Sequence, residues 1–196
     1  HEAYYVPLTH KLEGDELTAK QLDRDTVLAK LKPILENPNI GKIGQHLKYD
    51  AHILSHYDID LVGSIHASPN NWAMDTMLAS YVINAAITRH GMDDLARHYL
   101  QTQTISFEDV AGKGAKQVSF DQVAIDIASD YACEDADITY QLFDVFNKKL
   151  SDDENNAKLL HELEIPTAEI LCQMEASGIL IKRPFLNELS KRFDEE

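Results

Sequence analysis

The sequence predicts an α/β domain in which helices flank a mixed sheet, and three observations support this fold class. Short apolar runs bounded by turn residues are typical of strands, and one such run occupies residues 40–43. Longer segments repeat apolar residues every three or four positions, which is the period of amphipathic helices. Strand-like and helix-like segments are interspersed over the first 150 residues, which favours one α/β domain there.

The first half of the chain contains predicted strands and helices that are separated by polar or irregular segments. In order, they are a strand at 3–8, a helix at 27–35, a strand at 40–43, a helix at 46–57 and a helix at 76–83. Pro33 should kink or tighten the first helix. Residues 61–72 are expected to be irregular, and Asp75 is expected to N-cap the helix that follows them.

The second half is predicted to be mainly helical. Its expected elements are a helix at 92–99, a short capped helix at 106–109 and a long helix at 125–150. Composition then shifts to Asp, Glu and Asn around Ser151, so we place a domain boundary there, with domains at 1–150 and 151–196. In the second domain, the expected helix is interrupted by Pro166 and ends at Gly178, and Pro184 starts another helix.

Composition limits the functions that the chain can have. The net charge of −15 argues against a wide basic surface that binds duplex DNA. The two cysteines lack paired or metal-type spacing, which favours a reducing, cytoplasmic location. No apolar run has the length of a membrane helix, so no membrane partner is expected. No obligate protein partner is evident either.

The long helix carries two polar residues on its apolar face. Counting backwards along the helix in steps of three and four residues places Asp135 and Tyr131 on the face that carries the apolar stripe. The apolar members of that stripe are Ile138, Leu142, Val145 and Phe146. An ionised Asp on a buried face is costly unless a cation compensates it. Asp135 is therefore either a metal ligand with a phenol one turn away, or a residue at a frayed end of the stripe that faces water.

A second group of polar residues follows the strand at 40–43. In the segment 44–50, Asp50 lies in the first turns of a helix, and His46 shares its face at i, i+4. The helix dipole alone favours an acid at this position, so this signal is weak by itself. His52 and His56 have the spacing of a zinc pair, but no third ligand is apparent, and exposed histidines are the favoured interpretation.

Taken together and in order, these segments resemble the proofreading 3′–5′ exonuclease domain of bacterial family A DNA polymerases of the Klenow type. That domain is the Tyr variant of the DEDD exonuclease superfamily. The stretches that match are Gln45–Asp50, Met74–Tyr81, Arg89–Leu95, Thr104–Gly114 and Tyr131–Asp137. The resemblance covers nearly the whole chain and implies a ribonuclease H-like sheet with flanking helices. It also implies that residues 151–196 begin the polymerase domain.

The resemblance implies a chemistry and a set of site residues. Such enzymes cleave the 3′-terminal phosphodiester of single-stranded DNA with two Mg²⁺ or Mn²⁺ ions, which four carboxylates hold. Asp135 would serve the first metal and Asp50 the second, and Tyr131 would orient the attacking water. The residues implied to bind substrate are Gln45, His46, Tyr49, Arg89 and Phe107. His46 stands where the family commonly has Asn, and Glu134 and Asp137 are expected to point away from the site.

The chain departs from the family at its first motif, an Asp-x-Glu on a central strand. Asp-x-Glu occurs here only at 152–154 and 194–196, and neither match follows an apolar strand. We therefore expect a fragment that is truncated at both ends and holds half of a metal site. Such a fragment should bind at most one weakly held ion and should be inactive without the rest of the polymerase chain, which is its expected partner.

Two alternative functions remain open. The first is an RNase D-like exoribonuclease, since that group shares an Asp, an Asp and a Tyr at these positions; the polymerase-like segment after Ser151 argues against it. The second is an exonuclease fold kept only as a non-catalytic support for a polymerase. The presence of Asp50, Tyr131 and Asp135 argues against that loss of activity.

Overall fold

Helices surround a two-stranded parallel sheet in the computed structural model, which describes residues 2–11, 21–61, 72–86 and 89–194. Strand β1 (Lys42–Gly44) pairs with β2 (Trp72–Asp75), and Gly44 lies opposite Asp75 in the register. Because the strands are parallel, their carboxyl ends meet at one edge of the sheet. The described residues confirm the α/β class, with helix as the dominant structure.

The helices of the first half form where the sequence predicts them. They are α1 (Arg24–Leu35), α2 (Leu47–Ser55) and α3 (Thr76–Asn84). Pro33 lies inside α1, near its end. The strand expected at 40–43 begins two residues later, at Lys42.

The predicted strand at 3–8 is wrong. Within the described ranges no strand lies beside this segment, so its backbone has no ladder to join. Side chains hold it instead: the Tyr5 ring lies 6.3 Å from the Phe120 ring and edge-on to it, and the Tyr5 hydroxyl contacts His10. Just beyond, the Lys11 N–H donates to the carbonyl of Asp121 at 2.8 Å.

The expectation of irregular structure at 61–72 falls mostly outside the described residues, but its last residue is the start of β2. The local pattern does not reveal this strand, because its four residues end in a capping Asp and lead directly into a helix. Trp72 is nevertheless buried in the core, and its ring N–H donates to the carbonyl of Leu61 at 3.2 Å.

The second half is helical, as predicted, and is dominated by one long helix. Its elements are α4 (Met92–Leu95), the π-helix η1 (Ala96–Leu100), α5 (Phe107–Ala111), the 3₁₀ turns η2 (Gly114–Lys116) and η3 (Phe120–Gln122), and α6 (Ile125–Ser151). A capping box between Ser106 and Asp109 starts α5, which confirms the predicted short helix. The apolar stripe of α6 is buried at Ile138, Leu142 and Phe146.

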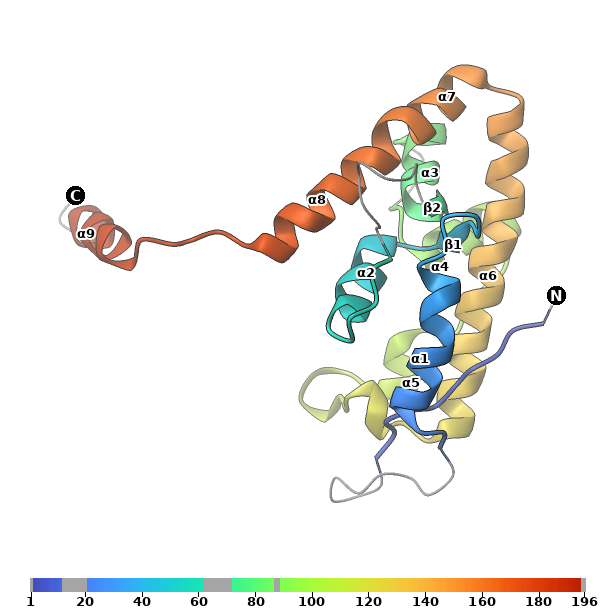
Figure 1. Cartoon of the computed structure of the whole chain (residues 1–196), viewed down its shortest axis with the longest axis horizontal. Helices are drawn as coiled ribbons and strands as arrows, with labels where there is room; N and C mark the ends of the chain where they lie inside the picture. The colour runs from blue at the N-terminus through green and yellow to red at the C-terminus, as the bar shows by residue number, and fades with distance from the viewer. Residues whose placement is uncertain (1, 12–20, 62–71, 87–88, 195–196) are drawn as a thin grey trace.

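After α6 the chain turns back on the body (Figure 1). The elements of this part are α7 (Glu154–Lys158), the π-helix η4 (Leu159–Glu164), α8 (Ile165–Ser177) and α9 (Arg183–Asp194). Leu160, Ile165 and Cys172 join the main core, whereas α9 stands apart at the end of an extended segment. The domain boundary at 150/151 stays a prediction, and the helices on both sides of it share one core.

One carboxyl group is buried in this packing. Glu169 on α8 is 6% exposed, and its Oε1 atom has no hydrogen-bond partner among the described residues. Desolvation raises the pKa of Glu169 to about 7. Elsewhere, no helix in the described ranges is long and apolar enough to cross a bilayer.

Candidate functional site

Tyr131 and Asp135 lie one turn apart on α6, as the spacing predicts. The Oδ1 atom of Asp135 is buried and has no hydrogen-bond partner within the described part of the chain. Desolvation raises the pKa of Asp135 to about 6, the Tyr131 hydroxyl partly offsets this rise by hydrogen bonding, and the carboxylates of Asp93 and Glu134 add to it. The carboxylate therefore lies in a setting that favours a proton or a cation beside it.

Aromatic rings surround Tyr131. Its ring centroid lies 5.9 Å from that of Phe120 and 6.2 Å from that of Phe107, and the two Phe rings stack at 6.3 Å. Burial, and next the charge of Asp135, raises the pKa of Tyr131 to about 12, so the hydroxyl keeps its proton near neutral pH. Phe107 is 38% exposed, which leaves part of its ring accessible beside Tyr131. The structure thus brings together Phe107, Tyr131 and Asp135.

The acidic neighbours of Asp135 differ from each other. Asp137 accepts a hydrogen bond from Gln141 at 2.6 Å, in the polar row that the periodicity predicts. Glu134, also expected to point away, accepts a hydrogen bond from the Ile105 N–H at 2.6 Å. It thereby holds the segment that leads into α5 and Phe107, a contact between residues too distant in sequence for periodicity to reveal.

Asp50 lies on α2 with His46 and Tyr49. His46 occupies the N-cap position with a left-handed backbone (φ 64°), and its ring centroid lies 6.3 Å from that of Tyr49, which is 62% exposed. Asp50 is exposed at the rim of a hollow of about 400 Å³ that Leu47 also lines. Although much of the residue is accessible, neighbouring atoms partly desolvate its carboxylate. This desolvation raises the pKa of Asp50 to about 6, and the negative charge of Asp75 adds to the rise.

Gly44 permits the close packing beneath Asp50. A Cβ atom built on Gly44 would collide with the Leu47 side chain and would lie 3.7 Å from Oδ2 of Asp50. Leu47 is buried in the core, so it has little room to move away. The glycine at the end of β1 therefore lets α2 begin directly against the strand.

Asp75 caps two helices at once. Its Oδ1 atom accepts the N–H groups of Met77 (2.9 Å) and Leu78 (3.3 Å) at the start of α3, which confirms the predicted N-cap. It also accepts from His46 (3.1 Å, Oδ1) and Leu47 (2.8 Å, Oδ2) at the start of α2, and it is 2% exposed. The second role depends on the parallel pairing of β1 with β2, which local sequence patterns do not reveal.

Residues 89–93 link the group around Asp50 with the group around Asp135. Gln45 donates to the carbonyl of His90 at 2.9 Å, while its Oε1 atom accepts a hydrogen bond from Thr76. On the other side, α4 packs on α6, and the negative charge of the Asp93 carboxylate helps to raise the pKa of Asp135. Arg89 is exposed, and its guanidinium forms no ion pair with any described residue.

The convergence of Asp50 with Asp135 stays a prediction. No hydrogen bond joins their groups directly in the described ranges. Across the same residues, no cluster of three or more His, Cys, Asp or Glu side chains is arranged to hold a metal ion. The structure therefore presents the two predicted metal ligands as separate carboxylates on α2 and α6.

Behind α2, α8 supplies partners that sequence reasoning missed. Glu175 forms an ion pair with Lys48 and accepts a hydrogen bond from His52 Nε2 at 3.0 Å. The buried Cys172 lies alongside, with its sulfur 3.8 Å from His52 Nε2. His52 thus contacts a neighbouring helix.

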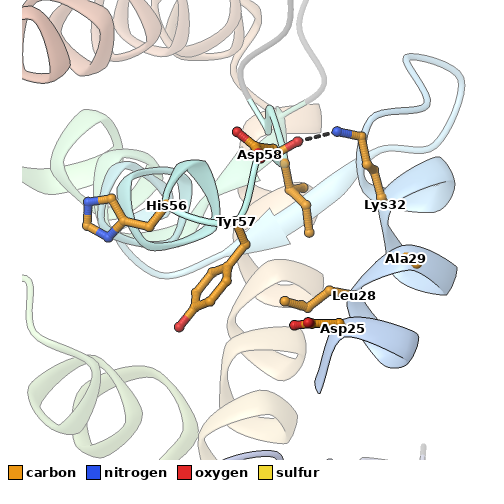
Figure 2. A pocket seen from close by; sticks show the side chains of 8 residues that line it. Asp25, Leu28, Ala29, Lys32, His56, Tyr57 and Asp58 are labelled. Atoms are coloured by element: carbon orange, nitrogen blue, oxygen red, sulfur yellow. Dashed lines mark hydrogen bonds between the residues drawn. The ribbon is translucent and has the colours of Figure 1, made fainter. Parts of the chain in front are cut away.

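Another hollow, of about 430 Å³, lies between α1 and the turn after α2 (Figure 2). The Lys32 ammonium donates to the carbonyl of Asp58 across it, and Leu28 and Ile59 line its apolar side. Nearby, the Arg24 guanidinium lies 5.1 Å from the centre of the Tyr57 ring. None of the predicted site residues lines this hollow, and its contacts join α1 to the end of α2.

The chain resembles known proteins over most or all of its length. A sequence model of the family described as 3′–5′ exonuclease matches residues 1–151. DNA polymerase I of Pseudomonas aeruginosa is 44% identical over 195 residues, which are 100% of this chain and 20% of that protein. DNA polymerase I of Rhizobium leguminosarum is 39% identical over 193 residues, 96% of this chain and 18% of that protein. The chain spans about a fifth of the length of these relatives.

A solved structure shows the same fold. It is described as the POL domain of Pol1 from M. smegmatis in complex with DNA primer-template and dNTP. The TM-score is 0.67 at 22% sequence identity, and the match covers 91% of this chain and 26% of that one. At this level of identity the likeness concerns the fold alone.

Proposed function

The chain belongs to the 3′–5′ exonuclease family of DNA polymerase I, and from this premise we propose that it forms the proofreading nuclease site of a longer DNA polymerase. Its substrate would be the single-stranded 3′ end of DNA, from which it would hydrolyse the terminal phosphodiester and release mononucleotides. Such a protein would serve replication and repair at the nucleoid, in the cytoplasm.

The observation that carries this proposal is the setting of Asp135. A carboxylate oxygen that is buried, unpartnered in the described residues and next to a protonated phenol fits a divalent cation, because a hard cation would supply the missing compensation. Asp50 is a second carboxylate with a raised pKa. Both donors are oxygen ligands, which suits Mg²⁺ or Mn²⁺.

In the proposed mechanism Asp135 and Asp50 would each hold one of two ions. When bound, the ions supply an activated water and neutralise the charge that develops on the phosphate. The Tyr131 hydroxyl, which keeps its proton, orients the attacking water by hydrogen bonding. Phe107 offers its exposed face to the terminal base, since stacking on an aromatic ring tolerates any base.

The other residues proposed to contact the substrate are assigned from their places around the two carboxylates. Arg89 is exposed and can meet a phosphate, while Gln45 holds the adjacent His90 carbonyl and so fixes the base of that loop. His46 and the exposed Tyr49 line the approach to Asp50. With a net charge of −15, the chain is suited to capture a frayed end and not to grip a duplex.

Two of the four carboxylates of the proposed site are still to be supplied. No Asp-x-Glu follows an apolar strand within residues 1–196. We propose that a segment of the longer protein provides them on a strand beside β1, and that residues 1–196 alone have little or no activity. The share of the relatives that this chain spans, about a fifth, supports a longer parent protein.

A nuclease assay on the full-length protein tests the proposal. Single-stranded DNA labelled at its 5′ end should shorten from the 3′ end in the presence of Mg²⁺, and a chelator should stop the reaction. Asp135→Ala should abolish shortening, whereas Asp137→Asn, on the polar row, should retain it. Preferential cleavage of RNA would instead indicate an exoribonuclease, and no cleavage of either substrate would indicate a non-catalytic support.

A further inference from the structure

A carboxylate on helix α8 contacts two residues of α2. Glu175 binds both Lys48 and His52, and these two residues are four positions apart on α2. In a helix, residues at i and i+4 lie on one face. Glu175 therefore contacts one face of α2 at two successive turns.

Asp50 lies on the opposite face of the same helix. It is two residues from Lys48 and two from His52, which corresponds to a rotation of about 200° at roughly 100° per residue. The only buried side chains of α2 are Leu47 and Ala51. Asp75 fixes the start of α2, and Leu54 packs against the core near its end. The Glu175 contacts restrain the rotation of the turns in between, and with it the direction of Asp50.

Glu175 itself is 48% exposed, but its two partners lie partly inside the packing between α2 and α8. Exposed pairs contribute little, but the side chains of Lys48 and His52 are only 23% and 30% exposed. The buried Cys172 lies one turn before Glu175 on α8, 3.8 Å from His52 Nε2 and 4.0 Å from the Lys48 carbonyl. Hydrogen bonds from Lys48 and His52 hold the pKa of Glu175 below its usual range, so it stays ionised at neutral pH.

We propose that Glu175 is a positioning residue for the exonuclease reaction, acting through Lys48 and His52 to aim the carboxylate of Asp50. This proposal rests on the proposed function, because it assigns Asp50 to a metal. It also means that α8, which lies beyond the expected domain boundary, holds one wall of the nuclease site in place. A shift of α8 would then move Asp50 with no change in α6.

The test is the rate of 3′-end hydrolysis by the full-length protein. Glu175→Ala should lower kcat roughly tenfold, since a displacement of about 1 Å at a catalytic group can cost still more. KM for single-stranded DNA should stay within about twofold, and the Mg²⁺ concentration for half-maximal rate should rise. Glu154→Gln is the matched control: it removes an exposed i, i+4 pair with Lys158 on α7, away from α2, and should leave kcat unchanged.

Two further variants separate positioning from general stability. The double variant Lys48→Ala/His52→Ala should lose as much rate as Glu175→Ala, and adding Glu175→Ala to it should cause no further loss. The charge reversal Lys48→Glu/Glu175→Lys should recover much of kcat. A melting temperature close to that of the wild type should accompany all of these changes.

The possible failures are distinguishable. A wild-type rate in Glu175→Ala, or additive losses in the combined variants, would overturn the positioning role and leave the proposed function standing. A loss that follows the melting temperature and is not rescued by the charge reversal would also overturn it. A full-length wild-type protein with no nuclease activity would overturn both proposals.

Discussion

The two carboxylates proposed to bind metal are held in contrasting ways. Asp135 lies in the middle of the 27-residue helix α6, which is anchored by its own buried stripe of Ile138, Leu142 and Phe146. Asp50 lies on the nine-residue helix α2, which is fixed by side chains from other elements, namely Asp75 of β2 and Glu175 of α8.

This difference shows that the two halves of one site can be positioned in different ways: one by the packing of its own helix, the other by side chains from distant parts of the sequence. A helix with a continuous apolar stripe fixes its polar residues through its own packing. A short helix does not, because a few turns bury too little surface, and it depends on capping and ion-pair partners. Substitutions far from Asp50 in the sequence should therefore disturb the position of Asp50. Substitutions equally far from Asp135 should disturb the position of Asp135 less.

The largest effect should come from removing either carboxylate. In the full-length protein, Asp50→Ala and Asp135→Ala should each lower the nuclease rate at least about a thousandfold, since each removes a metal ligand. Neither should reduce the free energy of unfolding at pH 8, because desolvation raises the pKa of both groups to about 6 and thus disfavours their ionised forms in the fold. Rate assays with urea titrations test both statements. Marked unfolding of either variant would contradict the second.

The next largest effect concerns the cap shared by α2 and α3. Asp75→Ala leaves four backbone N–H groups without their carboxylate in a buried setting, and it should lower the free energy of unfolding by about 3 kcal/mol. The control is Asp23→Ala, an exposed N-cap of α1, which should cost about 1 kcal/mol. Equal losses in urea unfolding would show that α2 does not depend on Asp75.

A smaller effect should appear at α8, the helix that supports α2. Because burial raises the pKa of Glu169 from 4.5 to about 7, this group favours the fold below about pH 4.5, and the benefit disappears as the pH rises through 7. Glu169→Gln should therefore be more stable than the wild type at pH 8, by about 1–2 kcal/mol after allowing for partial screening by solvent. Urea titrations at pH 5 and pH 8 measure the difference. A gain at pH 5 larger than that at pH 8 would contradict the sign.

The smallest effect should come from the phenol. Tyr131→Phe keeps the ring contacts with Phe107 and Phe120 and removes only the hydroxyl, so the nuclease rate should fall by about tenfold or less. The Mg²⁺ dependence should stay close to that of the wild type, since Asp135 remains. A loss as large as that of Asp135→Ala would mean that the hydroxyl does more than orient water.

The locally determined parts of the molecule could be predicted from the sequence. The period of α6 places Tyr131 and Asp135 one turn apart, and the caps at Asp75 and Ser106 involve groups within three residues. Strands were harder, because a strand needs a partner: residues 3–8 have none in the described ranges, whereas the four residues of β2 pair with β1. The contacts of Glu175 with α2 join residues more than 120 positions apart, and no local pattern encodes them.

The double cap at Asp75 also has a consequence for how the protein opens. One carboxylate accepts the first N–H groups of both α2 and α3, so a movement of Asp75 removes the cap from both helices together. The two helices should therefore behave as one cooperative unit in native-state hydrogen exchange, with the amides of Leu47 and Met77 exchanging through a common opening. Their protection would report the closure of the parallel strand pair itself, since the carboxylate reaches both helices only when β1 and β2 are in register.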